Sequence, residues 1–231
     1  MYQSLNMRMT SNAITNNRTV NLDSGKTVTQ PINTSGNYSI NFWGGMGFKV
    51  KKIDSRFDIW PNFNYSRNAD VFNSVVNYST NFSGGLGFGF SKSKDKKYDL
   101  NINNNFSYNN STNSQSSSSS HYYTNTVSLN LSVNILKTLV IKTDFDYYIQ
   151  QKTQDLSSDL TTKLWNAKLQ KTFKNDEFTL YLTVRDILNQ NVGIYRGFDR
   201  NTFSETRNDR LQRYWLLGFA WNFKNSGAAA K

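Results

Sequence analysis

The chain has no cysteine among its 231 residues. Disulfides, iron–sulfur clusters and thiolate metal sites are therefore excluded as sources of stability or chemistry. Proline occurs only twice, and no run of residues approaches the roughly 20 consecutive apolar positions that a membrane-spanning helix needs. The longest apolar-rich run is only 215–221. If the chain enters a membrane, it must do so with strands.

Residues that carry common catalytic chemistry are also scarce. The one histidine, His121, cannot build a multi-histidine metal site, and there is no cysteine to assist it. A barrel protease in which His121 works beside loop carboxylates such as Asp155 or Asp159 is the catalytic alternative, but an exposed loop histidine fits the pattern better. No P-loop, nucleophile elbow or dinucleotide-binding fingerprint is found in a suitable context. We therefore expect no enzymatic activity and no cofactor.

The charge of the chain is one-sided. Its 27 lysines and arginines outnumber 16 aspartates and glutamates, for a formal net charge of +11. Such a chain is attracted to anionic partners, for example lipopolysaccharide or acidic solutes. The basic residues are spread along the sequence instead of forming one patch or one helical face, so nucleic acid is not an expected partner.

What the sequence does contain is alternation with a period of two, which is shown best by its final stretch, 210–223. One side of this stretch is apolar and aromatic, and the other is small or polar, with Leu216 as the exception. The apolar side carries Leu211, Trp215, Leu217, Phe219, Trp221 and Phe223. This is the pattern of a strand that turns one face toward lipid.

About ten alternating segments follow one another in hairpin order. Short turns are predicted near residues 53, 94, 137 and 175, and longer polar loops at 16–35, 68–72, 109–120, 151–159 and 189–209. Short turns on one side and long loops on the other are typical of an outer-membrane barrel. A soluble sandwich also alternates, but it would not sort its turns by length so regularly. We predict an all-β, antiparallel transmembrane β-barrel over residues 1–223 and a disordered polar tail over 224–231.

Two local features predict departures from regular strands. Pro61 cannot donate a ladder hydrogen bond, so a bulge or a sheet edge is expected there. The segments 41–48 and 81–88 both read Asn-Phe-x-Gly-Gly-x-Gly-Phe, and most of their glycines fall on the polar face. Such glycines either let a wide sheet coil or let a ligand approach the backbone, and coiling is the favoured interpretation.

Eight charged residues fall on the polar side, which is predicted to face the lumen, because charge there avoids contact with lipid. The favoured interpretation is a cross-strand network of ion pairs on a hydrated wall, and the alternative is contact with a plug or a solute. The eight are Arg8, Asp58, Asp99, Lys142, Asp144, Asp146, Lys168 and Arg185.

One pair of motifs carries a family resemblance. The segment Asp-Ile-Leu-Asn-Gln-Asn at 186–191 is followed by a polar loop and then by a last strand that begins Arg-Tyr-Trp at 213. This arrangement resembles the C-terminal barrel region of TonB-dependent receptor-like outer-membrane proteins of the Bacteroidetes type. The strand pattern extends the resemblance over essentially the whole chain. It implies a plugged barrel of about 22 strands that takes up a nutrient such as a glycan, a peptide or a metal chelate.

Compared with that family, the sequence has about ten strands and shows no plug, TonB box or secretory signal after Met1. We therefore expect the C-terminal half of a longer receptor, which supplies the barrel wall and outer loops of a TonB-dependent transporter in the bacterial outer membrane. The expected partners are outer-membrane lipid and lipopolysaccharide, a plug domain and TonB. The alternative is a stand-alone small outer-membrane barrel that acts as a structural protein, an adhesin or a passive pore. The polar groups of 186–189 are expected to cap a loop instead of binding a ligand.

Overall fold

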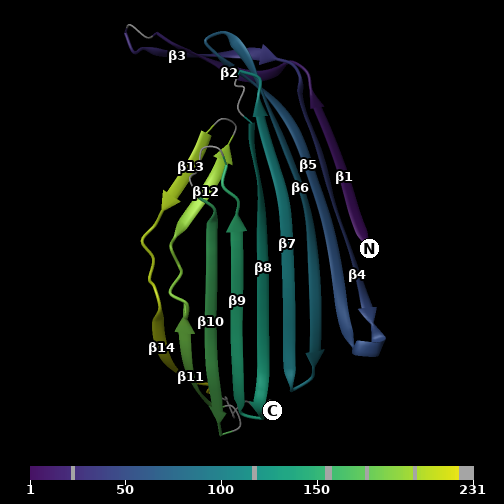
Figure 1. The fold of residues 1–231 in the computed structure, drawn as a ribbon, viewed down its shortest axis with the longest axis vertical. Helices are drawn as coiled ribbons and strands as arrows, with labels where there is room; N and C mark the ends of the chain where they lie inside the picture. Colours follow the sequence, from purple (N-terminus) through teal and green to yellow (C-terminus); the bar gives the residue numbers. More distant parts are fainter. Residues whose placement is uncertain (22–23, 116–118, 154–157, 175–176, 200–201, 224–231) are drawn as a thin grey trace, which may run out of the picture.

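A computed structural model describes residues 1–21, 24–115, 119–153, 158–174, 177–199 and 202–223 of the chain. This part is built almost entirely of strands, which form one 12-stranded sheet and one two-stranded sheet (Figure 1). A single 3-10 turn, η1 (Lys51–Ile53), connects two of the strands. Within the described ranges, no helix has the length and apolar character needed to cross a membrane. The predicted all-β, antiparallel class is confirmed.

Ten strands are neighbours in one continuous antiparallel order. From one edge to the other they are β1 (Tyr2–Thr10), β4 (Asn37–Val50), β5 (Ser55–Phe72), β6 (Val75–Lys94), β7 (Tyr98–Asn113), β8 (Ser119–Leu136), β9 (Leu139–Gln150), β10 (Leu160–Phe173), β11 (Phe178–Arg185) and β14 (Tyr214–Trp221). These are the ten alternating segments predicted from the sequence, in the predicted hairpin order. β14 is shorter than the predicted 210–223, so Leu211 and Phe223 flank it.

Four further strands lie where long loops were predicted. β2 (Ala13–Val20) and β3 (Thr27–Thr34) form a hairpin beyond the end of β1, and β12 (Ile194–Asp199) pairs with β13 (Thr202–Arg207). β1 ends at Thr10, and Asn12 turns the chain into β2 with a φ of +52°. These four strands pair through their backbones and lack a long apolar stripe, so alternation of hydrophobicity does not reveal them.

The β5–β6 hairpin also differs from the prediction. Instead of a loop at 68–72, both strands continue to a two-residue turn at Asn73 and Ser74, whose φ values are +48° and +63°. Positive φ at both central residues is the turn geometry that matches the twist of paired strands. The Ser/Asn tract at 109–120 is likewise largely strand, at the ends of β7 and β8. Strand pairing thus extends well beyond the alternating segments.

Pro61 interrupts a ladder without shifting its register. β5 has a partner strand on each side, so Pro61 does not lie on a sheet edge. On the β4 side the pairing stops at Asn62 and resumes at Ile59 in the same register. The predicted bulge or edge is therefore wrong. The ring removes only one donor, and the facing residues, Gly44 and Gly45, have no side chains to force the strands apart.

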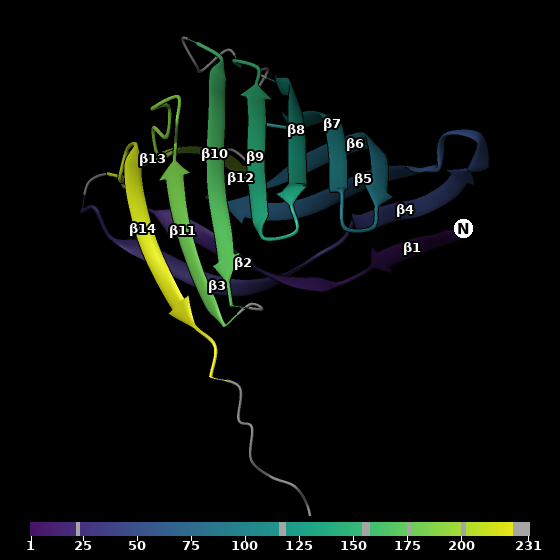
Figure 2. The same cartoon turned by 90° about the horizontal axis from the view of Figure 1, so that it is seen from below.

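The register confirms that the apolar positions of successive strands share one face. One row crosses six strands and pairs, in turn, Tyr98, Val133, Ile141, Leu169, Leu182 and Leu217. Among the described residues no second layer covers this face: Leu217 is 75% exposed and Phe219 is 63% exposed. Figure 2 shows the ten neighbouring strands of the main sheet as one curved layer. A sandwich would bury such side chains between two sheets, so this face is suited to lipid.

The sheet does not close on itself. Among the described residues, β1 pairs only with β4 and β14 only with β11, and the two strands lie at opposite ends of the sheet (Figure 1). Three of the predicted short turns, near 53, 94 and 137, connect strands at one end of the sheet. The turn near 175 is only partly described, and the predicted tail at 224–231 lies outside the described residues.

Candidate functional site

All eight charged residues singled out from the sequence lie in strands, on the face opposite the apolar one. Arg8 is in β1, Asp58 in β5, Asp99 in β7, Lys142, Asp144 and Asp146 in β9, Lys168 in β10 and Arg185 in β11. The register brings some of them together: Lys142 lies directly opposite Lys168. Others are isolated, such as Arg8, which faces Ser39 near one sheet edge.

The carboxylates on this polar face are satisfied mainly by neutral donors instead of the expected cross-strand ion pairs. Asp58 does bind a cation, but this is Arg56 of its own strand, at 2.7 Å. The other contacts join Asn166 to Asp144 at 2.5 Å, Ser128 to Asp146 at 2.6 Å and Asn101 to Asp99 at 2.7 Å. Amide and hydroxyl donors satisfy the acceptor oxygens of these three carboxylates within the wall itself.

The glycines of the polar face make room for neighbouring aromatic rings. A Cβ atom added to Gly87 would lie 1.8 Å from Nε1 of Trp60, because the indole covers this part of β6. The same Nε1–H donates to Oδ1 of Asn105 at 2.7 Å. Tyr181 covers Gly218 of β14 in a similar way. The protein fills the space above these glycines with its own side chains, so a ligand groove at this place is ruled out.

The Asp-Ile-Leu-Asn-Gln-Asn segment caps the loop that follows β11. Asp186 is 4% exposed, and its carboxylate oxygens accept hydrogen bonds from the backbone N–H groups of Gln190 at 2.9 Å and Asn191 at 3.0 Å. Asn189 accepts from the backbone N–H of Arg213 at 3.1 Å, which joins the start of the loop to its end. Asp186 and Asn189 both have positive φ, which these residue types tolerate well. The expected loop-capping role is confirmed.

We expect Asp186→Ala to loosen this loop by about 1–3 kcal/mol, because two backbone N–H groups lose their acceptor. Asp186→Asn is the matched variant, since it keeps an acceptor oxygen and tolerates positive φ. The measurement is hydrogen exchange of residues 187–213 in the membrane-embedded protein. Faster exchange in the alanine variant than in the asparagine variant is the expected result, and equal rates in the two variants would contradict the capping role.

His121 lies in β8 and not in a loop. It is exposed and sits opposite Asn110 of β7. Of the loop carboxylates considered with it, Asp159 accepts a hydrogen bond from the backbone N–H of Lys152, and Asp155 is outside the described residues. Within the ranges that the structure describes, no three histidine, aspartate or glutamate side chains are grouped to hold a metal ion.

The β12–β13 hairpin lies against the polar face of β9 and β10. Arg196 of β12 donates from Nε to Glu205 and from Nη1 to the carbonyl of Ser158, both at 2.8 Å, and its side chain is only 8% exposed. The hydrogen bond from Arg196, followed by that from Arg207, lowers the pKa of the Glu205 carboxyl. The hairpin is thus held to the segment just before β10 by a charged hydrogen bond, and its two strands are joined by the Arg196–Glu205 ion pair.

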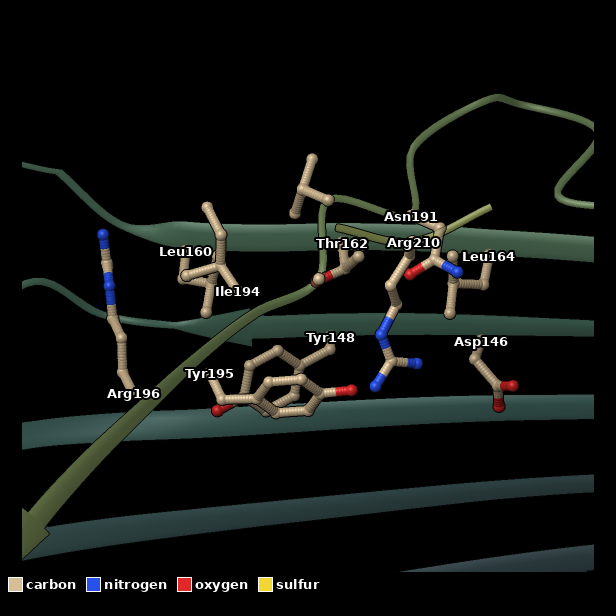
Figure 3. A pocket seen from close by; sticks show the side chains of 12 residues that line it. Asp146, Tyr148, Leu160, Thr162, Leu164, Asn191, Ile194, Tyr195, Arg196 and Arg210 are labelled. Atoms are coloured by element: carbon tan, nitrogen blue, oxygen red, sulfur yellow. The ribbon is translucent and has the colours of Figure 1, made fainter. Parts of the chain in front are cut away.

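Two adjoining cavities lie on the polar face near this hairpin, and Figure 3 shows the side chains that line the first of them. The first, of about 320 Å³, lies between β12 and the strands β9 and β10. The second, of about 490 Å³, continues toward the end of β11 and the start of β14. The two share Leu164, Asn191 and Arg210. We refer to them together as the hairpin groove, and its other main lining residues are Asp146, Tyr148, Leu160, Arg185, Asp186, Tyr195, Arg196 and Tyr214.

Two of the eight predicted residues, Asp146 and Arg185, line the hairpin groove, and the other six lie elsewhere on the wall. Sequence reasoning missed the hairpin side of the groove because 189–209 was interpreted as a polar loop. One signal was available: Leu160 and Leu164 fall on the polar side of β10, and Leu160 is only 6% exposed. Apolar residues on an otherwise polar face indicate that another segment covers them.

A family model described as an outer membrane protein beta-barrel family matches residues 59–221, which run from within β5 to the last residue of β14. The matched range includes the whole hairpin groove and the loop-capping segment. No curated protein and no solved structure matches the chain.

Proposed function

The chain belongs to the outer membrane protein β-barrel family and is therefore a protein of the bacterial outer membrane. On this premise we propose that it forms the wall and outer loops of a TonB-dependent transporter or receptor for nutrient uptake. In this proposal the apolar face contacts outer-membrane lipid, and the polar face lines the lumen. The loops at the β12–β13 end face outward, toward lipopolysaccharide. A plug domain and TonB complete the transporter. The resemblance of 186–191 and the last strand to TonB-dependent receptor-like proteins supports this assignment.

The observation that carries the proposal is the open sheet. In lipid, each unpaired backbone N–H or C=O group at a strand edge costs several kcal/mol, so β1 and β14 both need partner strands. A barrel of ten strands would pair β1 with β14, but the two lie at opposite ends of the curved layer (Figure 2). A larger barrel supplies further strands to both edges, and its wide lumen suits a large nutrient.

The charges of the polar face fit a water-filled lumen. Lys142 and Lys168 are directly opposite each other, and the Lys168 ammonium lies 4.3 Å from the centre of the Tyr181 ring. Two facing lysines of this kind favour a hydrated surface or an acidic partner. We assign the eight polar-face residues to the lumen lining on this basis, and their partner would be a plug surface or a solute.

Whether β1 and β14 are neighbours tests the proposal. The chain has no cysteine, so pairs of introduced cysteines can be cross-linked without background. Asn6→Cys in β1 is combined in turn with Leu216→Cys and Ala220→Cys in β14, and a short bismaleimide is added to outer membranes. We expect no intramolecular cross-link. The control pair, Thr179→Cys with Ala220→Cys, is directly opposed in the β11–β14 ladder and should cross-link efficiently.

Cross-linking between β1 and β14 would show that ten strands close alone, and would favour the small-barrel alternative. Conductance in planar bilayers also distinguishes the transporter from the small-barrel alternative. A plugged transporter is expected to remain closed to small ions, whereas a passive pore conducts steadily. Both measurements use the complete membrane-embedded protein.

A further inference from the structure

We propose that the hairpin groove binds a solute that joins a carboxylate to an apolar body, with Arg210 holding the carboxylate. Tyr195 and Leu164 would contact the apolar part. This inference rests on the proposed function, because a solute reaches the groove only through the lumen. It goes beyond that function by naming a site and a chemical class of ligand.

The charges around the groove favour an anion. Among the described residues, neither Arg185 nor Arg210 belongs to an ion pair, whereas Arg196 is held by Glu205 and by a backbone carbonyl. The groove also contains two carboxylates, and both are engaged. Those of Asp186 accept backbone N–H groups, and Asp146 accepts the Ser128 hydroxyl. The oxygens of both carboxylates thus already accept hydrogen bonds, whereas no ion pair among the described residues uses the guanidinium donors of Arg185 or Arg210.

Arg210 is placed to act on both halves of the groove, since it lines each of the two cavities. Its guanidinium carbon lies 5.1 Å from the centre of the Tyr195 ring, and in Figure 3 its end points into the space between Tyr195 and Asp146. The aromatic ring restrains the guanidinium without using its hydrogen-bond donors. A planar, restrained fork of donors matches the two oxygens of a carboxylate.

The remaining lining favours an apolar body on the ligand. Leu160, Leu164 and Ile194 face the first cavity together with the rings of Tyr148 and Tyr195. Aliphatic side chains are unusual on this face, which elsewhere carries mainly polar and charged residues with a few aromatic rings. The volume of about 320 Å³ falls in the range of small-molecule sites, which are mostly apolar with a few polar groups that fix orientation. A simple inorganic anion would leave these side chains unused.

Equilibrium dialysis of the complete protein in lipid nanodiscs tests the inference, with radiolabelled phenylacetate and neutral phenylacetamide as probes. We expect phenylacetate to bind about tenfold or more tightly than the amide, because a hydrogen bond to a charged group is stronger than one between neutral groups. Arg210→Gln should remove this preference. Arg18→Gln, in the outer β2–β3 hairpin, is the matched control and should keep it. Empty nanodiscs correct for partition into lipid.

Equal binding of the two probes by the wild-type protein would overturn the inference, as would equal losses in the Arg210→Gln and Arg18→Gln variants. Arg210→Lys adds a second reading, since it keeps the charge but loses the planar fork, and an intermediate preference is expected. Failure here with the expected cross-linking pattern would remove the groove site and leave the transporter wall. A cross-link between β1 and β14 together with an intact preference for phenylacetate would remove the transporter wall and leave the groove site.

Discussion

Replacing Leu129 with arginine is expected to destabilise the membrane-embedded protein by about 2–4 kcal/mol, the cost of a basic side chain on the lipid face of a barrel near the bilayer midplane. Leu129 lies in β8, and its register partners are Ile102 of β7 and Phe145 of β9. The substitution also removes packing among these three side chains. The measurement is a urea titration of the protein reconstituted in liposomes, with the folded fraction read from its heat-modifiable migration.

The neighbouring residue provides the control. Asn130 lies on the polar face, opposite Asn101 and Asp144, so an arginine there meets water and a carboxylate. We expect Asn130→Arg to change stability by no more than about 0.5 kcal/mol. Similar costs at the two positions would mean that the two faces of the sheet have been assigned wrongly, and the membrane orientation of every strand would then have to be revised.

The second large effect is expected at Gly87. Its missing side chain leaves the space that the Trp60 ring occupies, and an added Cβ would lie 1.8 Å from the indole nitrogen. Gly87→Ala therefore forces the ring away and breaks its 2.7 Å hydrogen bond to Asn105. Overpacking of this kind costs about 1–3 kcal/mol. The same urea titration measures the loss.

A double-mutant cycle identifies the cause. In a Trp60→Ala background the added methyl group meets no ring, so Gly87→Ala should cost much less than it does in the wild type. Residues in direct contact show coupling of about 0.5–3 kcal/mol, whereas independent sites are additive. Additive losses would show that the glycine is required for another reason, such as coiling of the strand.

If these results hold, the two faces of the wall have different tasks. The lipid face tolerates any large apolar residue, because lipid imposes no shape. The polar face tolerates fewer substitutions. Rings such as Trp60 and Tyr181 pack over specific glycines, and a carboxylate such as Asp144 accepts a hydrogen bond from a specific amide. Specificity for a solute would then reside in the polar face and in the hairpin that covers it, which is where the groove lies.

The ten principal strands and their order were determined by the sequence alone. Lipid acts on every second side chain of a spanning strand, so the constraint is local and can be read along the chain without knowledge of any partner. The loop-capping role of Asp186 is local as well, because the carboxylate reaches N–H groups only four and five residues away.

The tertiary structure alone decided the four extra strands, the unbroken register at Pro61, the filled glycine row and the hairpin groove. The four extra strands form two local hairpins. The other three features depend on residues that are distant in sequence: Arg196 and Ser158 are 38 positions apart, and Trp60 and Asn105 are 45 apart. Such contacts leave no periodic trace, because they form only after strand pairing has set which backbones are neighbours. The open edges of β1 and β14 have the same origin, since pairing across a sheet is a property of its curvature and width and not of any one strand.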